Sequence, residues 1–190
     1  MKTKATFKSM IEGDAEDFLA MDAADQRHAK KLPEVVLAEL KKLDDAEPTM
    51  NISRYQHSLQ SATLAYRDSA EEEMVVAALL HDIGDSLAIY NHAEMAATIL
   101  RPYVAEKTYW IIKHHAIFQG YYYRHHLGDD RNARDKYADH PWFDACVVFC
   151  EKYDQNAFDD EYDTLPLEFF ESMVERVFSR EPFGEHVLAL

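Results

Sequence analysis

The sequence predicts an all-α fold in which one domain, a single compact helical bundle, spans residues 1–190. Apolar residues recur at helical intervals almost throughout the chain, as expected for helices with one buried face. The chain contains neither Asn-Gly nor Asp-Gly, the dipeptides typical of tight hairpins, and no long alternating run of β-branched residues. With 47% hydrophobic residues and only 5 Gly and 6 Pro, it is suited to one sizeable core.

Two helices are expected near the N-terminus. The acidic residues Asp14 and Asp17 are suited to the first turn of a helix, whose N-terminal end carries partial positive charge. Pro33 is expected to begin the second helix, which continues to Leu43. Residues 46–50 contain a proline and are expected to interrupt the helical pattern.

The next two helices are expected to form the centre of the fold. One begins at about Ser53. Ser69 and Glu72 have the spacing of a capping box, which predicts the start of the other. Residues 74–80 are apolar on all sides, so this helix should be buried and should end at His81.

Proline and polar residues divide the rest of the chain into further segments. The expected elements, in order, are a helix over 91–100, a helix over 107–115 separated from it by Pro102, an aromatic stretch over 119–126, a solvated loop over 129–139, a helix opened by Pro141, and a last helix over about 166–180. Cys146 and Cys150 lie four apart on one of these helices, where a disulfide is rare, so they are expected to be reduced, buried thiols.

The charge of the chain excludes several classes of function. It carries 35 acidic and 20 basic residues, a formal net charge of -15, which would repel a nucleic acid backbone or an anionic membrane. Its first residues lack the apolar stretch of a secretory signal, and no segment approaches the roughly 20 apolar residues that cross a bilayer. We therefore expect a soluble, cytoplasmic protein; the sequence does not determine its oligomeric state.

Histidines are the first indication of chemistry. The sequence contains 10 of them, and several lie in or beside predicted helices, an arrangement that suits a metal site inside a helical bundle. These are His57, His81, His92, His114 and His115.

The dipeptide His81-Asp82 is suited to the centre of such a site. Adjacent residues on a helix diverge by about 100°, so both reach one metal most easily where the helix ends, and Gly84 supplies that end. The two oxygens of Asp82 could bridge two ions while imidazoles fill the remaining positions. Neutral His with ionised Asp suits iron, manganese or zinc.

These residues carry a family resemblance. His57, His81-Asp82 and Asp154 resemble the H...HD...D signature of the HD-domain superfamily, most members of which are metal-dependent phosphohydrolases. The segment His57-Ser58-Leu59-Gln60-Ser61-Ala62 is similar to the HxxQxA motif of the PhnZ-type hydroxyphosphonate oxygenases and the myo-inositol oxygenases. Residues 151–155 resemble the segment that closes the metal site of those oxygenases, and the resemblance extends over roughly residues 55–158.

The resemblance implies a helical HD fold with a mixed-valent pair of iron ions, Fe2+ and Fe3+, that oxidises a small hydroxylated substrate with O2. It assigns His57, His81 and Asp154 to one iron, His92 and His115 to the other, and Asp82 to the bridge between them. No catalytic residue is expected beyond these metal ligands. The expected organisation is an HD-type domain over 1–190, with a metal-binding core over about 53–158, N-terminal helices over 14–45 and a C-terminal helix over about 166–180.

Departures from the resemblance concern the substrate. Three residues after the bridging Asp, the inositol oxygenases carry Lys and the PhnZ-type enzymes carry His, whereas this chain carries Asp85. Four residues after the second-iron histidine, a phosphonate-binding Lys is replaced by Gln119. An acidic group would repel phosphonate, so that substrate is not carried over. Gln60, Asp85 and Gln119 are the expected substrate-binding residues.

Several alternatives remain open on sequence alone. His114 competes with His115 for one ligand position; His115 follows Ile111 by one turn on the apolar side and is favoured. The run Tyr121–Tyr123 could form a cage for a quaternary ammonium group, but plain packing is favoured. The cations after it could bind an anionic substrate group or form a solvated face; these are Arg124, His125, His126, Arg131 and Arg134.

The function also has alternatives. A metal-dependent HD phosphohydrolase, with manganese or zinc in place of iron, would activate water against a phosphate ester or nucleotide. A degenerate HD module that senses or binds a partner is disfavoured by the complete set of ligands. Gln60 and the pair His92 and His115 favour the oxygenase.

Overall fold

In a computed structural model of the chain, which describes residues 2–44 and 50–188, every regular element is a helix. No strand occurs in these residues, so the predicted all-α class is confirmed. The chain divides into two compact units, Met1–Val36 and Leu37–Leu190. That one domain covers residues 1–190 stays a prediction, and most of the expected break at 46–50 lies outside the described residues.

The N-terminal unit contains a short 3-10 turn, η1 (Met10–Glu12), and helix α1 (Ala15–Ala29). Asp14 caps α1, because its side chain accepts a hydrogen bond from the backbone N–H of Asp17 and its own N–H donates to the Asp17 carboxylate. The expected acidic helix start is therefore confirmed. Asp17 is only 3% exposed and also accepts a hydrogen bond from the Thr6 backbone.

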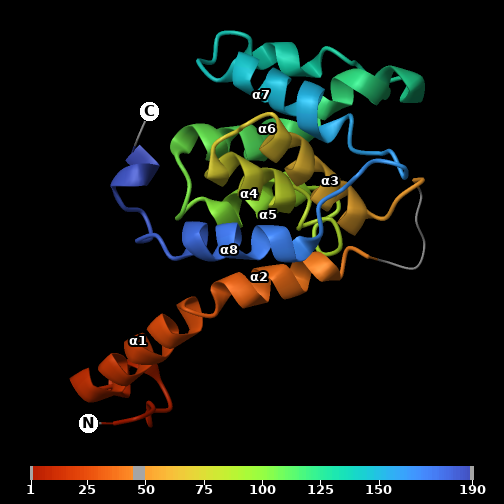
Figure 1. Cartoon of the computed structure of the whole chain (residues 1–190). Coiled ribbons are helices and arrows are strands. Elements are labelled where there is room, and N and C mark those ends of the chain that lie inside the picture. The colour runs from red at the N-terminus through yellow and green to blue at the C-terminus, as the bar shows by residue number, and fades with distance from the viewer. Residues whose placement is uncertain (1, 45–49, 189–190) are drawn as a thin grey trace. The chain divides into compact units, whose positions relative to one another are not determined.

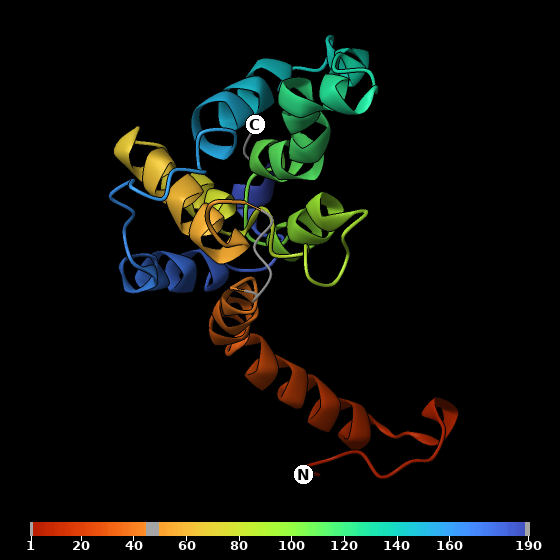
Figure 2. The same ribbon diagram turned by 90° about the vertical axis from the view of Figure 1, so that its right-hand side faces the viewer.

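The second unit is a bundle in which α3 and α4 lie side by side at the centre. Helix α8 packs on α4 on one side, while α6 packs on α5 and on α7 toward the other (Figure 1, Figure 2). The helices are α2 (Leu32–Lys41), in which the boundary between the units falls, α3 (Arg54–Arg67), α4 (Glu72–Leu80), α5 (His92–Leu100), α6 (Glu106–Tyr123), α7 (Phe143–Phe149) and α8 (Leu167–Phe178). Four short segments complete it, namely the 3-10 segments η2 (Arg124–Leu127), η3 (Ala133–Tyr137) and η5 (Glu185–Leu188) and the π-helical turn η4 (Cys150–Asp154).

The central helix α4 is buried, as the sequence predicts. Its residues from Val75 to Leu80 are at most 1% exposed, because neighbouring helices cover it on several sides. The expected capping box is wrong. Glu71, not Ser69, precedes α4, and no side chain caps it. Ser69 lies in the left-handed region (φ 61°), and its N–H donates to the Tyr66 carbonyl oxygen at the end of α3.

Two expected boundaries differ from the structure because tertiary packing extends the helical region. Helix α6 does not end at His115 but continues to Tyr123, since Phe118 and Gly120 are buried in the bundle. Residues 129–139 are not simply a solvated loop. They include η3, whose Tyr137 packs its ring on Phe118, with ring centroids 6.3 Å apart.

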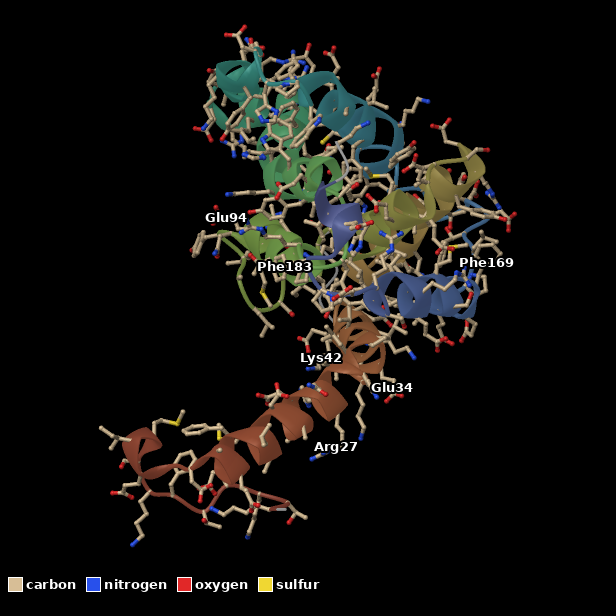
Figure 3. All side chains as sticks on the ribbon, turned by 90° about the vertical axis from the view of Figure 1, so that its left-hand side faces the viewer. Arg27, Glu34, Lys42, Glu94, Phe169 and Phe183 are labelled. Atoms are coloured by element: carbon tan, nitrogen blue, oxygen red, sulfur yellow. The ribbon has the colours of Figure 1, made fainter. Side chains whose placement is uncertain are left out.

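The remaining helices agree with the expected order. Pro166 caps the last helix, and the helix that follows Pro141 continues into η4, where the Gln155 N–H donates to the Cys150 carbonyl oxygen at 3.0 Å. Cys146 and Cys150 are free and buried, as predicted. In Figure 3, the labelled Glu94 on α5 and Phe169 on α8 lie on opposite sides of the second unit. Among the described residues, no helix is long and apolar enough to span a bilayer.

The Asp17 carboxylate predicts a pH dependence for the N-terminal unit. Lys2 donates to it and is the main reason why the pKa of Asp17 is lowered to about 2. Because the folded-state pKa is depressed, its contribution to stability is present above about pH 4, the pKa of an unfolded Asp, and is lost as pH falls toward about 2. We expect Asp17→Asn to accelerate amide hydrogen exchange in α1 at about pH 7 and much less at about pH 3.

Asp25→Asn is the matched control, because Asp25 is exposed on the same helix. Equal acceleration by Asp17→Asn at both pH values would contradict the assignment.

Candidate metal centre

Six histidine and aspartate side chains converge at the centre of the second unit. Two of them, His81 and Asp82, are adjacent in the chain, and each of the other four comes from a different helix or helix end. Two groups of their ligand atoms each lie within 4.8 Å of one another, and a third such group combines Asp82 and His92 with Asp85. The contributors are His57 on α3, His81 and Asp82 directly after α4, His92 at the start of α5, His115 on α6 and Asp154 at the end of η4. The structure thus brings together every residue that the resemblance assigns to metal.

The first half of the cluster consists of His57, His81 and Asp154, all buried. The Nε2 atoms of His57 and His81 lie 3.4 and 3.7 Å from Oδ1 of Asp154. On the other side of each ring, Nδ1 faces a backbone carbonyl oxygen, that of Ala157 at 2.9 Å and that of Ala78 at 2.8 Å. A carbonyl oxygen only accepts, so each Nδ1 carries a proton and donates it, which leaves Nε2 directed at the cluster as the atom that binds either a metal ion or a second proton.

The second half is built around Asp82. Its Oδ1 lies 3.1 Å from Nε2 of His115 and 3.5 Å from Nε2 of His92, while its Oδ2 lies 3.6 and 3.4 Å from the Nε2 atoms of His57 and His81. The two carboxylate oxygens therefore face different pairs of histidines. Such a carboxylate can be shared between two cations.

Two features indicate that this cluster is suited to a cation. The Nε2 atoms of His57 and His81 lie only 3.2 Å apart, so two lone pairs would face each other unless a proton or a metal ion lies between them. Oδ2 of Asp154 is buried and has no hydrogen-bond partner among the described residues. A metal ion would satisfy both, and a donor set of imidazole nitrogen and carboxylate oxygen fits iron, manganese or zinc.

The electrostatics of the cluster favour ionised carboxylates. Burial alone would raise the pKa of Asp82 and Asp154, but the surrounding histidines outweigh it and lower both pKa values below the usual range. Burial likewise opposes the charged form of His81, yet Asp82 and Asp154 raise its pKa to about 10. A proton and a metal cation therefore compete for the same position.

The cluster opens into a cavity of about 420 Å³. Three lining positions on α6, at 115, 119 and 122, are spaced by four and three residues and so lie on one face of that helix. Besides the clustered side chains, the lining includes Met50, Arg54, Asp85, Ala116, Gln119, Tyr122, Tyr123, Gln155 and Phe158. Asp85 and Gln119, two of the predicted substrate residues, therefore lie where a substrate would bind.

Gln60, the third predicted substrate residue, lies elsewhere. Its amide nitrogen donates to the Asp159 carbonyl oxygen at 2.7 Å, and its amide oxygen accepts from the Asp159 N–H at 3.0 Å. The amide nitrogen also lies 3.3 Å from the Thr164 hydroxyl. Gln60 does not line the cavity, so its position supports a structural role, which is to tie the chain that follows η4 to α3.

Sequence reasoning missed two residues at the cavity. Arg54 donates from Nε to Oδ2 of Asp85 at 2.7 Å, and Phe158 stacks on the ring of His57 with centroids 4.5 Å apart. The spacing of Arg54, three residues before His57, was an available signal because such residues share a helix face. No sequence signal identifies Phe158, since its position depends on the path of the chain after η4.

The structure also separates the alternatives that the sequence leaves open. His114 is outside the cluster; its Nδ1 donates to the Trp110 carbonyl oxygen, and its ring packs on Tyr137. Asp154 is buried, whereas the acidic residues that follow it in the chain, Asp159, Asp160 and Asp163, are exposed. Tyr122 and Tyr123 line the cavity, whereas Tyr121 does not.

Asp85 lies at the edge of the second half. Its Oδ1 is 3.0 Å from Nδ1 of His92, while Arg54 holds its other oxygen. Burial raises the pKa of Asp85, and the Asp82 charge adds to this effect, although His92 and Arg54 oppose it. Asp85, in the loop between α4 and α5, thus adds a second carboxylate beside Asp82 and His92.

Gly84 sets the position of His92 by close approach. A Cβ at residue 84 would lie 2.8 Å from the backbone oxygen of His92, 2.9 Å from its Cα and 3.1 Å from Cβ of Met95. We expect Gly84→Ala to displace the start of α5, to destabilise the fold by about 1–3 kcal/mol and to weaken metal binding. Thermal unfolding and metal content after dialysis against a weak chelator measure the two effects.

Gly128→Ala is a useful control. Gly128 has φ 83°, so the substitution is strained there, but a Cβ would meet no atom within 4 Å. It should lower stability without changing the metal content, and loss of metal in both variants would contradict the role of Gly84.

The adjacent histidines on α6 allow a matched test of the cluster. We expect His115→Ala to weaken metal binding at least about tenfold, because its Nε2 faces Asp82, whereas His114→Ala should leave metal affinity unchanged. Competition with a chromophoric chelator measures the affinity. If both substitutions weakened binding alike, the cluster would not be the metal site.

Comparison with known proteins agrees with this geometry. The family model described as HD domain matches residues 54–140, while no curated protein matches the chain. Five of the six clustered side chains lie in the matched segment, and Asp154 lies beyond it. Residues 54–140 are thus similar in sequence to an HD domain.

Proposed function

We propose that the chain is an HD-domain oxygenase that holds two iron ions, Fe2+ and Fe3+, and oxidises a small hydroxylated substrate with O2. The observation that carries this proposal is the position of Asp82, whose two oxygens face two separate pairs of histidines. In this proposal His57, His81 and Asp154 hold one ion, and His92 and His115 hold the other. Six protein ligands leave coordination positions for substrate and O2 on the side of the cavity.

The composition of the donor set supports iron. Four imidazoles and two carboxylates suit Fe2+ and Fe3+, with manganese or zinc as the alternatives. When bound, such a pair would supply Lewis acidity toward a substrate hydroxyl and the redox equivalents for activation of O2. The two ionised carboxylates lower the net charge of the loaded centre, and the backbone carbonyls that accept from Nδ1 fix the imidazole orientation.

The cavity wall supports a substrate that presents a neutral, hydroxylated end to the metal centre. Among the described residues that line it, Arg54 is the only cation, and its guanidinium is bonded to Asp85. Because Asp85 already neutralises the charge of Arg54, the cavity wall is poorly suited to bind a phosphonate. Gln119 has a buried amide oxygen without a hydrogen-bond partner among the described residues, which is suited to accept from a substrate hydroxyl.

The side chains around the ions would position the substrate and exclude water from the site. Phe158 covers the ring of His57, and Met50 and Tyr122 supply apolar surface to the cavity. A partly apolar wall reduces competing access of water to the oxidised substrate. Asp85 and Gln119 are proposed to orient the substrate, and no acid or base beyond the metal ligands is required.

A metal-dependent phosphohydrolase is the second candidate, and the HD domain detected at residues 54–140 favours it. In that reaction the metals would activate water against a phosphate ester or nucleotide, with Arg54 beside the leaving group or the phosphate. The two functions share the same ligands, so loss of activity after substitution of His81 or Asp82 does not distinguish them.

Metal content and spectroscopy separate the two candidates. Protein purified without oxygen is expected to contain about two irons per chain and, after partial oxidation, to give the EPR signal of a coupled Fe2+/Fe3+ pair. His92→Ala should remove this coupled signal because it removes a ligand of one ion only, and His114→Ala should retain it. Oxygen uptake with a panel of small hydroxylated compounds then identifies substrates.

A different metal content and a different reaction would identify the phosphohydrolase. One zinc or manganese per chain, together with release of phosphate from ester substrates in the absence of O2, would exclude the oxygenase and establish the hydrolase.

A further inference from the structure

Two arginines of the segment that follows η2 have no anionic partner in the part of the chain that the structure describes. Arg131 and Arg134 are half-buried, yet neither forms an ion pair there. Four other arginines of the same unit each pair with a carboxylate; these are Arg54, Arg67, Arg176 and Arg180. In a chain with a net charge of -15, cations left without a carboxylate call for an explanation.

Their hydrogen-bond donors are also unsatisfied. Nε of Arg131 and both Nε and Nη1 of Arg134 are shielded from solvent and have no hydrogen-bond partner among the described residues. A buried charged donor without an acceptor is costly. Both guanidiniums lie over the ring of Tyr121, at 4.1 and 3.8 Å from its centroid. This cation–π contact offsets part of the cost, but a ring face does not accept from the N–H edges of the guanidinium.

The distribution of charge in the segment is opposite to that of a solvated loop. Its acidic residues Asp129, Asp130 and Asp135 are exposed, whereas Arg131 and Arg134 turn inward against α6. The segment therefore does not use its own carboxylates to neutralise its arginines. No carboxylate of the described residues accepts a hydrogen bond from either arginine.

We propose that Arg131 and Arg134 bind an anionic group, a phosphate or a carboxylate, beside Tyr121 on the face of α6 that η3 covers. Guanidinium N–H edges match the oxygens of both groups and form charge-assisted hydrogen bonds with them. The site is distinct from the metal centre and does not depend on which metal that centre holds.

The anion site lies next to the wall of the metal cavity. The rings of Tyr121 and Tyr122 are 5.5 Å apart, and Tyr122 lines the cavity. Burial raises the pKa of Tyr122, with Cys150 and Glu151 adding to the rise, and the positive charge of Arg134 opposes it. The bound anion is therefore either the acidic end of a substrate that reaches past Tyr122 or a separate small anion.

Calorimetric titration with inorganic phosphate tests the site on the full chain with its metals. The wild-type chain should bind one phosphate at this site, and Arg134→Gln and Arg131→Gln should each weaken that binding at least about tenfold. Lys136→Gln is the matched control. It removes one positive charge from the same segment, but Lys136 is exposed and lies over Tyr137 instead.

The outcomes decide the proposal. Weakening in both arginine variants but not in Lys136→Gln supports it. Absence of phosphate binding in the wild-type chain, equal binding in all variants, or equal weakening in Lys136→Gln would overturn it. Arg134→Lys keeps the charge and is expected to fold if Arg134→Gln does not; it should still bind phosphate more weakly, because it lacks the planar fork.

The spectrum of the metal centre distinguishes the two sources of the anion. If phosphate shifts that spectrum in the wild-type chain and no longer does so in Arg134→Gln, the site holds the acidic end of a substrate. If phosphate binds through the arginines and leaves the spectrum unchanged, the site holds a separate anion. Calorimetry reports binding whatever the metal, so failure of the diiron assignment would not be mistaken for failure of the anion site.

Discussion

The carboxylate of Asp82 is shared between two pairs of histidines, and the geometry of the whole site depends on this contact. Oδ1 faces His92 and His115, and Oδ2 faces His57 and His81. The chain therefore has to bring α3, α5 and α6 to the end of α4 at the same time. The bundle achieves this because residues Val75–Leu80 of α4 are apolar and buried on every face at its centre.

Backbone carbonyls then determine what the histidines can do. Nδ1 of His57, His81 and His115 each lies within 2.7–2.9 Å of a carbonyl oxygen, so every Nε2 is left to point at the cluster. Without a cation, lone pairs and carboxylates would meet in a buried space, and the raised pKa of His81 reflects this. Binding of a metal and stability of the bundle are consequently linked, since the ligands are placed only in the folded state.

Two faces of helix α6 contact different parts of the second unit. Positions 115, 119 and 122 line the metal cavity, while His114, Phe118 and Tyr121 face η3 and the nearby Arg131 and Arg134. The extension of this helix to Tyr123 is what makes both faces available, and a helix ending at His115 would provide neither Tyr122 nor Tyr121. A charge bound on the η3 side would act on the cavity through Tyr121 and the neighbouring Tyr122, which lines the cavity.

Much of this protein is determined by local sequence patterns. Helical periodicity predicts the all-α class and the buried α4, the capping pair Asp14 and Asp17 predicts the start of α1, and the resemblance to HD-domain oxygenases predicts the members of the cluster. Only the tertiary structure decided that His115 rather than His114 joins the cluster, that Gln60 ties down the chain after η4, and that Arg131 and Arg134 turn inward. The physical reason is that periodicity and capping depend on neighbours within a few residues, whereas burial, ion pairing and access to a cavity depend on segments distant in the sequence.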